Sequence, residues 1–308
     1  MMRATPRRIA VDILTRVDED GAYAEPLLDA ALSGGGVTIP ADRGLLTELV
    51  YGTLRMRGRL DWIIARLYRG ATAQMETSVL NILRTGLYQL WFTDRIPPFA
   101  AVSEAVGIAR QCAPAASGLV NAILRNAIRK KASLDWPELT KEPVEAIAVL
   151  HSHPTWLVQR WIARLGVEET LALCRANNAI PPQALRVNTL KASRDQVREA
   201  LAAEGITSDP SAHAPDALLL TTHAAGLRET AVYKAGWIRV QDEASQLIAQ
   251  LVAPGSGERI LDLCAGTGGK TLHLAALMKN SGRITALDLH AERLGMLRLE
   301  AERLGVSI

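Results

Sequence analysis

The chain has 308 residues, of which 48% are hydrophobic and 22% charged, and this composition excludes a disordered or fibrous protein. Its length exceeds what one compact core usually holds and therefore predicts two or three domains. The three cysteines are far apart, which excludes a disulfide framework and a Cys-x-x-Cys metal site, and no apolar run is long enough to span a bilayer. We therefore expect a cytoplasmic monomer that binds neither membrane nor metal.

The formal net charge of +3 is unevenly distributed along the chain. Residues 1–135 carry 17 Lys and Arg against 13 Asp and Glu, whereas the rest of the chain carries 18 against 19. A mildly basic first domain is compatible with nucleic-acid binding, because neutralisation of phosphates drives much of that binding. A solvated, Arg-rich helical surface explains the same count, and both interpretations stay open at this point.

Residues 7–131 are predicted to be helical throughout, because their apolar residues recur at spacings of three and four. A break is expected at Gly58, a flexible loop at residues 34–36, and the end of a helix before residues 96–98, where two prolines follow an isoleucine. Residues 1–135 are therefore predicted to form an all-α domain with short connections.

The pattern becomes mixed in residues 136–235. Helices are expected within residues 143–178, followed by strands at 184–190 and 218–221. Between the two strands, Ser193 and Gln196 have the spacing of a capping box that opens an amphipathic helix ending near residue 204. This range is therefore predicted to be a small α+β domain with helices in front.

Residues 236–308 alternate between strand and helix, which predicts a parallel, Rossmann-like α/β domain. The predicted strands are residues 237–241, 259–264 and 283–288, and the predicted helices are residues 242–252, 269–278 and 291–304. Residues 306–308 resemble the first residues of a further strand. Because so few strands cannot cover both faces of a doubly wound sheet, we expect the chain to end inside this domain.

A glycine-rich turn after the predicted buried strand at 259–264 has the character of a nucleotide-type cofactor site. Glycines let the backbone approach a ligand, and amides at a helix start favour an anion such as the methionine carboxylate of S-adenosylmethionine. Asp288 follows Gly266 by 22 residues, where this fold places a carboxylate that binds ribose hydroxyls. Asp262 is expected near the donor or its loop. The predicted donor-binding residues are Cys264, Ala265, Gly266, Thr267, Gly268, Gly269, Lys270 and Asp288.

Three other interpretations of this turn stay open on spacing alone. A phosphate-binding loop matches at Gly269, Lys270 and Thr271, but Cys264 replaces its first glycine. A dinucleotide loop matches at Gly266 and Gly268, but Thr271 replaces its third glycine. The glycines also fit a turn with a purely structural role.

Residues 261–271 (Leu-Asp-Leu-Cys-Ala-Gly-Thr-Gly-Gly-Lys-Thr) resemble the first motif of the Nop/Sun family of RNA cytosine-5 methyltransferases. Residues 239–247 resemble the strand-to-helix segment of that family, and residues 185–191 resemble its substrate-side strand. In the helical domain, residues 48–55, 95–97, 101–106 and 120–125 resemble a NusB-like RNA-binding domain. The resemblance covers essentially the whole chain and points to the bacterial ribosomal branch called RsmB, or Sun.

The resemblance implies S-adenosylmethionine-dependent methylation of carbon 5 of one cytosine of 16S rRNA, nucleotide 967 in the family's name, without a metal. Family members form an adduct between a cysteine and carbon 6 and release the product with a second cysteine, and both positions fall beyond residue 308. We therefore expect no catalytic residue in this chain, and a fragment that is inactive alone. Gly266 and Thr267 stand where the family usually has Ala-Pro, which adds freedom to the loop.

The three cysteines present are expected to be structural: Cys264 ends a predicted buried strand, and Cys112 and Cys174 lie in predicted helices. His151 and His153 are the only close histidine pair, and a capping or packing role is expected for them.

RNA contacts are predicted at Arg186 and Asn188 on the substrate-side strand, and at Arg125 and Arg129 in the helical domain. Two rival functions remain. The first alternative to the methyltransferase is a non-enzymatic NusB-like RNA-binding or antitermination factor, and the second is a phosphate-loop nucleotidase.

Overall fold

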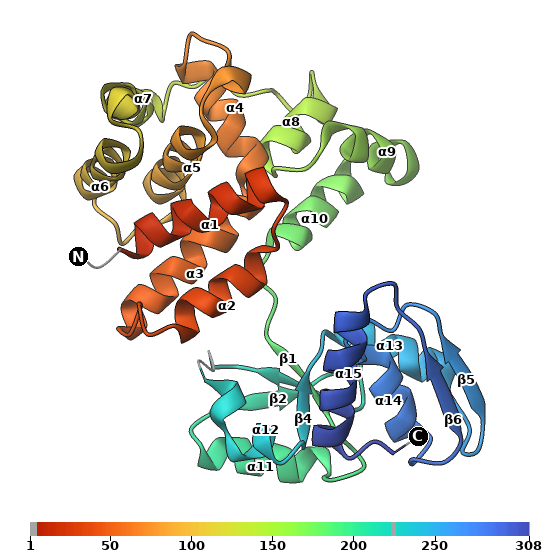
Figure 1. Ribbon diagram of the computed structural model, residues 1–308. Helices are drawn as coiled ribbons and strands as arrows, with labels where there is room; N and C mark the ends of the chain where they lie inside the picture. Colours follow the sequence, from red (N-terminus) through yellow and green to blue (C-terminus); the bar gives the residue numbers. More distant parts are fainter. Residues whose placement is uncertain (1–4, 223–225, 308) are drawn as a thin grey trace. The chain divides into compact units, whose positions relative to one another are not determined.

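The computed structural model describes residues 5–222 and 226–307, and its internal contacts divide the chain into two compact units, Met1–Ala179 and Ile180–Ile308 (Figure 1). The first unit is built from helices alone within its described residues, and the second combines two small sheets with helices. The predicted sequence of an all-α domain, a small α+β domain and a partial α/β domain is confirmed.

The helices of the first unit begin and end at local signals that the sequence carries. Thr5 caps α1 by accepting a hydrogen bond from the Arg8 amide, and Gly21 ends it in the left-handed conformation. Gly58 lies inside α4, so the predicted break is displaced to Met56. The bounds are α1 Pro6–Asp20, α2 Ala24–Ser33, α3 Pro40–Arg55, α4 Arg57–Leu67, α5 Thr77–Phe92, α6 Pro98–Cys112, α7 Ser117–Lys130, α8 Pro143–Leu150, α9 Thr155–Leu165 and α10 Val167–Asn178, with 3-10 turns at Thr72–Gln74 and Pro114–Ala116.

Helix α5 is the centre of this unit and packs against α1, α6 and α7 (Figure 1). It is buried even at polar positions, and Arg84 forms ion pairs there with Asp18 and Asp61. Gly52 of α3 allows the closest approach to α5, because a Cβ at this position would lie 2.1 Å from Cζ of Tyr88. The apolar core around α5 thus also contains a close glycine contact and a buried ion-pair network.

Helices α8, α9 and α10 form a small core of their own and α8 also contacts α4, so they belong to the first unit. The division at residue 179 therefore falls inside the range 136–235 that the sequence suggested for one domain. A division into two units does not test a division into three domains, so the predicted domain ranges 1–135, 136–235 and 236–308 stay a prediction.

The second unit opens with a four-stranded sheet in the order β2-β3-β1-β4, with antiparallel neighbours. Strand β1 ends three residues earlier than predicted, because the Asn188 side chain accepts a hydrogen bond from the Leu190 amide and turns the chain. The predicted capping box of Ser193 and Gln196 is confirmed and opens α11. The bounds are β1 Ala184–Val187, α11 Arg194–Ala203, β2 Ser208–Pro210, β3 Ala217–Leu220, α12 Ala231–Lys234 and β4 Ile238–Val240, with a 3-10 turn at Leu227–Glu229.

The remaining elements are α13 Glu243–Val252, β5 Arg259–Asp262, α14 Gly269–Leu277, β6 Arg283–Ala286 and α15 Ala291–Leu304. Strands β5 and β6 pair in parallel, as predicted. The assignment of β4 to the same parallel sheet is wrong, since β4 pairs antiparallel with β1. Alternation of strands and helices does not determine which sheet a strand joins. Val306 and Ser307 form no strand, and Ile308 lies outside the described residues.

Candidate donor-binding site

The glycine-rich loop continues the pairing of β5 with β6 and then turns into α14. The Leu287 amide donates to the Asp262 carbonyl oxygen at 2.8 Å, and the Ala265 amide donates to the Leu287 carbonyl oxygen at 2.9 Å. Gly266 and Gly268 then take positive φ values of 55° and 87°, which favour glycine. The loop is thus fixed at its start by β6 and turned by two glycines.

Asp262 holds both ends of this loop. One carboxylate oxygen accepts a hydrogen bond from the Cys264 amide at 3.2 Å, and the other accepts one from Oγ1 of Thr271 at 2.7 Å. The sequence placed Asp262 near the donor or its loop. The structure gives it a loop-supporting contact on each side of the turn.

The first turn of α14 presents backbone amides toward the loop. In the described part of the chain, the amides of Gly269, Lys270 and Thr271 donate to no acceptor, as is usual at a helix start. Apart from its chain neighbours and the backbone of α14, no heavy atom of the described residues lies within 4 Å of a Cβ built on Gly269. Free amides, the positive end of a helix and open space above the backbone together suit a carboxylate ligand.

Asp288 follows β6 and lies beside the loop. Its Oδ2 accepts a hydrogen bond from the Gly266 amide at 2.8 Å, and its Oδ1 accepts one from the His290 amide at 2.9 Å. The amides of His290 and Gly266 hold the pKa of this carboxyl below its usual value. A carboxylate has about four lone-pair positions, so an ionised Asp288 keeps capacity for ribose hydroxyls.

Arg186 and Asn188 are buried, with 1% and 2% of each residue exposed, so neither presents a surface to RNA in this structure, and their contact with RNA stays a prediction. Strand β1 is an inner strand, and its Arg186 guanidinium donates to the Gly269 carbonyl oxygen and to Oε1 of Gln241, each at 2.8 Å. Burial lowers the pKa of Arg186 to about 9, which still leaves the side chain charged at neutral pH. Arg186 therefore supports the first residue of α14.

Arg239 is a second support that the sequence did not single out. Its guanidinium donates to the Thr267 carbonyl oxygen at 2.9 Å and forms an ion pair with Glu300 of α15 at 3.2 Å. Burial lowers the pKa of Arg239. Only the family segment at residues 239–247 signalled this position, because both partners are distant in sequence.

His273 lies on the buried side of α14. Its Nε2 is 3.1 Å from Oδ2 of Asp216, and its Nδ1 has no partner within the described residues. Burial lowers the pKa of His273 despite the neighbouring carboxylate. The ring therefore packs neutral beneath the helix that starts at the candidate site.

The expectation that Cys264 is buried is wrong: it is exposed, as are Leu261 and Leu263 on the same segment. Strand β5 has one strand neighbour among the described residues, so only part of its surface is covered. Cys174 is buried and Cys112 is partly buried. Burial raises the pKa of both thiols, in agreement with structural roles.

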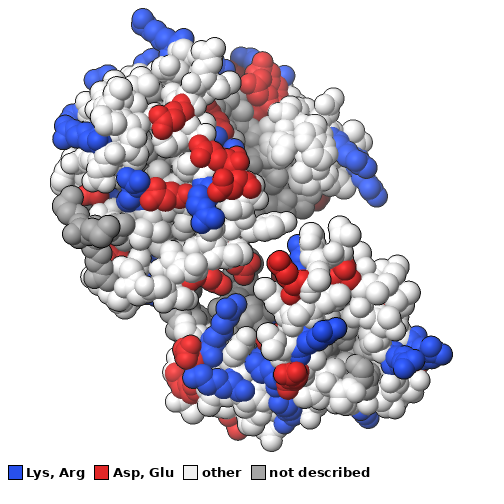
Figure 2. Space-filling model, viewed as in Figure 1, with Lys and Arg blue, Asp and Glu red and all other residues white. Residues whose placement is uncertain are grey.

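The helical unit holds the other two predicted RNA-contact residues, Arg125 and Arg129, both exposed on α7. Figure 2 shows Asp and Glu side chains gathered near the middle of the visible face of this unit, with Lys and Arg among and around them. Across residues 5–222 and 226–307, no helix is long and apolar enough to cross a membrane, and no group of three or more His, Cys, Asp or Glu is placed to hold a metal ion.

Three family models match successive parts of the chain. The NusB family matches residues 4–129, the ferredoxin-like domain of RsmF/B-like methyltransferases matches residues 153–225, and the model described as 16S rRNA methyltransferase RsmB/F matches residues 249–308, which include the loop. The chain belongs to the RsmB/F methyltransferase family. The family expected from the motifs is thereby confirmed, with a NusB domain preceding the ferredoxin-like and methyltransferase domains.

Curated relatives agree with this assignment. The chain is 37% identical over 295 residues to a probable ribosomal RNA small subunit methyltransferase B of Bacillus subtilis, covering 95% of this chain and 64% of the relative. It is 40% identical over 253 residues to the ribosomal RNA small subunit methyltransferase B of Pseudomonas syringae pv. tomato, covering 82% of this chain and 55% of the relative. The chain thus spans between 55% and 64% of the length of these two relatives.

Solved structures support the fold of this RsmB/F family member. The crystal structure of PH0851 matches with a TM-score of 0.78 and 25% identity, covering 99% of this chain and 68% of that one. A methyltransferase homologue from Pyrococcus horikoshii matches with a TM-score of 0.50 and 29% identity, covering 54% of each chain.

Proposed function

We propose that this RsmB/F family chain is the RNA-binding and donor-binding part of an S-adenosylmethionine-dependent 16S rRNA methyltransferase that acts in the cytoplasm. The carrying observation is the loop after β5, where free amides at the start of α14 lie beside an ionised carboxylate bonded to the Gly266 amide. Names of the relatives, all small subunit rRNA methyltransferases, support the substrate class.

The residues of the loop fit the donor in two ways. The amides of Gly269 and Lys270 suit its methionine carboxylate, and Asp288 suits the two ribose hydroxyls. The loop residues predicted to bind the donor, from Cys264 to Thr267, would contact it through their backbone atoms. The donor supplies an electrophilic methyl group, and the loop residues bind and orient it.

The resemblance supports a finer assignment of substrate and chemistry. On that basis we propose that the methyl group is added to carbon 5 of a cytosine, nucleotide 967 in the family's name, after a cysteine thiolate has added to carbon 6. Cys112 and Cys174 lie in the helical unit, and Cys264 belongs to the loop itself. We therefore propose that residues 1–308 bind donor and RNA without transferring the methyl group alone.

Calorimetric titration of the chain with S-adenosylmethionine, and in parallel with ATP, tests the proposal. We expect the methyl donor to bind and ATP not to bind. Asp288→Asn should weaken donor binding by about tenfold or more, since it removes a charged hydrogen-bond acceptor. Asp209→Asn, at an exposed position of β2, serves as the matched control and should leave donor affinity unchanged.

Each alternative has its own outcome in this experiment. Binding of ATP without the methyl donor would support the phosphate-loop nucleotidase. Binding of neither compound by a chain with native helical content would contradict the donor site, and RNA binding alone would then favour the non-enzymatic factor.

A further inference from the structure

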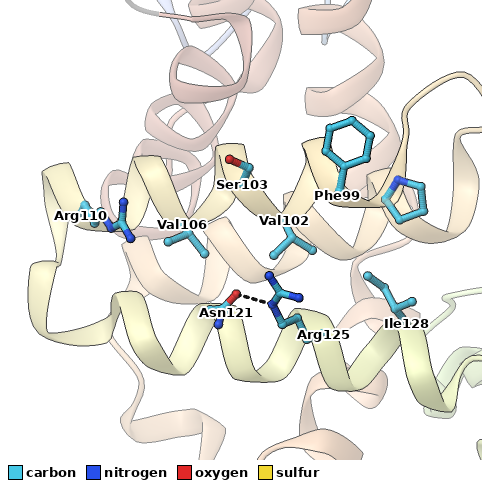
Figure 3. A pocket seen from close by; sticks show the side chains of 9 residues that line it. Phe99, Val102, Ser103, Val106, Arg110, Asn121, Arg125 and Ile128 are labelled. Atoms are coloured by element: carbon cyan, nitrogen blue, oxygen red, sulfur yellow. Dashed lines mark hydrogen bonds between the residues drawn. The ribbon is translucent and has the colours of Figure 1, made fainter.

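A groove of about 460 Å³ runs between α6 and α7 of the helical unit (Figure 3). Its apolar walls are formed by Val102 and Val106 of α6 and by Ile128 of α7. This volume lies within the range of about 300–1,000 Å³ that is usual for ligand sites. The groove is remote in sequence from the donor loop, and the proposed function assigns it no role.

Two arginines give the groove positive charge, one at an end and one near its middle. Arg110 lies at one end, and Arg125 rises from α7 toward Val102, held by a 2.9 Å hydrogen bond from its Nε to Oδ1 of Asn121 (Figure 3). None of the residues that line the groove is acidic. Within residues 5–222 and 226–307, neither arginine forms an ion pair.

The helices that form the groove are basic as a pair. Together α6 and α7 carry four basic residues and one acidic residue, Glu104, and their net charge is therefore +3. Glu104 does not line the groove. Of the four basic residues, Arg110 and Arg125 line the groove, and this positive charge suits a polyanion.

Phe99 lies on α6 toward the opposite end of the groove from Arg110, and Ile128 lines that end from α7 (Figure 3). Phe99 is 76% exposed, which is unusual for a phenylalanine, and among the described residues no ring contact or core position accounts for it. An exposed ring and arginines in one groove suit a single-stranded nucleic acid, because bases stack on the ring while phosphates contact the guanidinium groups.

We propose that the α6–α7 groove binds a single-stranded segment of RNA. One base stacks on Phe99 and contacts the apolar wall, and the phosphates of the neighbouring nucleotides contact Arg125 and Arg110. From residue 99 to residue 110 the helix rises about 17 Å, which accommodates a few nucleotides. An apolar protein partner would leave both arginines unpaired, so the charge favours RNA. The proposal specifies an RNA-contact surface for the proposed function and rests on it.

Fluorescence anisotropy of a labelled oligouridylate with the whole chain tests the proposal. Phe99→Ala should weaken binding by about fivefold to a hundredfold, the usual loss for one stacked base. Arg110→Gln with Arg125→Gln should weaken it and reduce the slope of log affinity against log salt by about 1.4, or about 0.7 per phosphate contact. Phe99→Trp should retain binding. An oligouridylate duplexed with oligoadenylate should bind more weakly than the single strand.

Two matched controls lie outside the groove in the same unit. Tyr23→Ala removes an aromatic side chain that is 74% exposed, and Arg164→Gln removes an exposed arginine near the end of α9. Both should bind RNA as the unchanged chain does. Because Phe99, like the two arginines, is exposed, its replacement leaves the fold intact, which circular dichroism verifies.

Equal RNA affinity of the Phe99→Ala chain and the unchanged chain would overturn the proposal. So would equal losses in the Tyr23→Ala and Arg164→Gln controls. Unchanged RNA affinity together with loss of a dimer in Phe99→Ala would identify the groove as a contact between copies. Donor titration of the same variants separates this proposal from the function: RNA loss with intact donor binding supports both, and RNA loss in a chain that binds no donor supports the groove alone.

Discussion

Three glycine positions of the donor loop should respond differently to alanine, although the sequence gives them similar surroundings. Gly266 has φ 55° and no heavy atom within 4 Å of an added Cβ, so alanine adds only left-handed strain, about 1 kcal/mol. Gly269 begins α14 with neither a positive φ nor a close neighbour, so alanine should stabilise the chain by up to about 1 kcal/mol.

Gly268 combines both penalties. Its φ of 87° lies beyond the usual left-handed range, and an added Cβ would lie 2.7 Å from Cγ of Leu297 and 3.1 Å from Cδ1 of Leu272. Overpacking of this kind costs about 1–3 kcal/mol, and with the strain we expect Gly268→Ala to destabilise the second unit by about 3 kcal/mol.

Urea denaturation followed by fluorescence of Trp237, the only tryptophan after residue 179, measures all three variants in the unit concerned. The expected order of stability is Gly269→Ala, then Gly266→Ala, then Gly268→Ala. Equal losses for Gly266→Ala and Gly268→Ala would refute the steric reasoning, since only the contact with α15 and α14 separates them.

Three further predictions concern buried contacts. Burial lowers the pKa of His273 below its unfolded value of about 6.5, so near this pH the folded state binds fewer protons than the unfolded state. Stability should therefore fall as the pH drops through about 6.5. Thermal unfolding across this pH range should show a smaller fall for His273→Gln than for the unchanged chain. Gly52→Ala should destabilise the helical unit by about 3 kcal/mol through its clash with Tyr88, whereas Gly44→Ala, in open space on the same helix, should not, as denaturation by circular dichroism will test. Arg186→Met should lower the stability of the second unit by about 2 kcal/mol, because the loss of two charged hydrogen bonds outweighs the removal of a desolvated charge. The same variant should bind the donor more weakly. Equal donor affinity of the variant and the unchanged chain in calorimetry would argue against a supporting role of Arg186 in the loop.

Local signals in the sequence predicted much of the fold. The helix at residues 291–304 matches α15 at both ends, and the capping box of Ser193 and Gln196 forms as its spacing indicated. Strand β2, Ser208–Pro210, was missed because a three-residue strand that contains proline has no apolar alternation. Sequence patterns predict a helix or its end correctly where the residues that form the stabilising contact lie within one helical turn of each other.

The sequence singled out each residue of the proposed donor loop, and donor binding at these residues stays a prediction, whereas the residues that support the loop were not recognised as such. A charged residue on a strand gives no sign of which neighbours cover it, so Arg186 was assigned to an RNA-contact surface although its partners lie 55 and 83 positions away. The strand at 238–240 likewise has a pairing partner that only the folded chain determines. Long-range pairing is the information that residue spacing lacks.

Asn188 has a consequence for how the second unit unfolds. Its Nδ2 donates to the Gly236 carbonyl oxygen, next to β4, and to the Leu304 carbonyl oxygen at the end of α15, both at 2.8 Å. Separation of the antiparallel sheet from α15 would leave a buried amide without partners. The ferredoxin-like and methyltransferase parts, which family models separate, are thereby joined into one cooperative folding unit whose slow-exchanging amides should become exposed together.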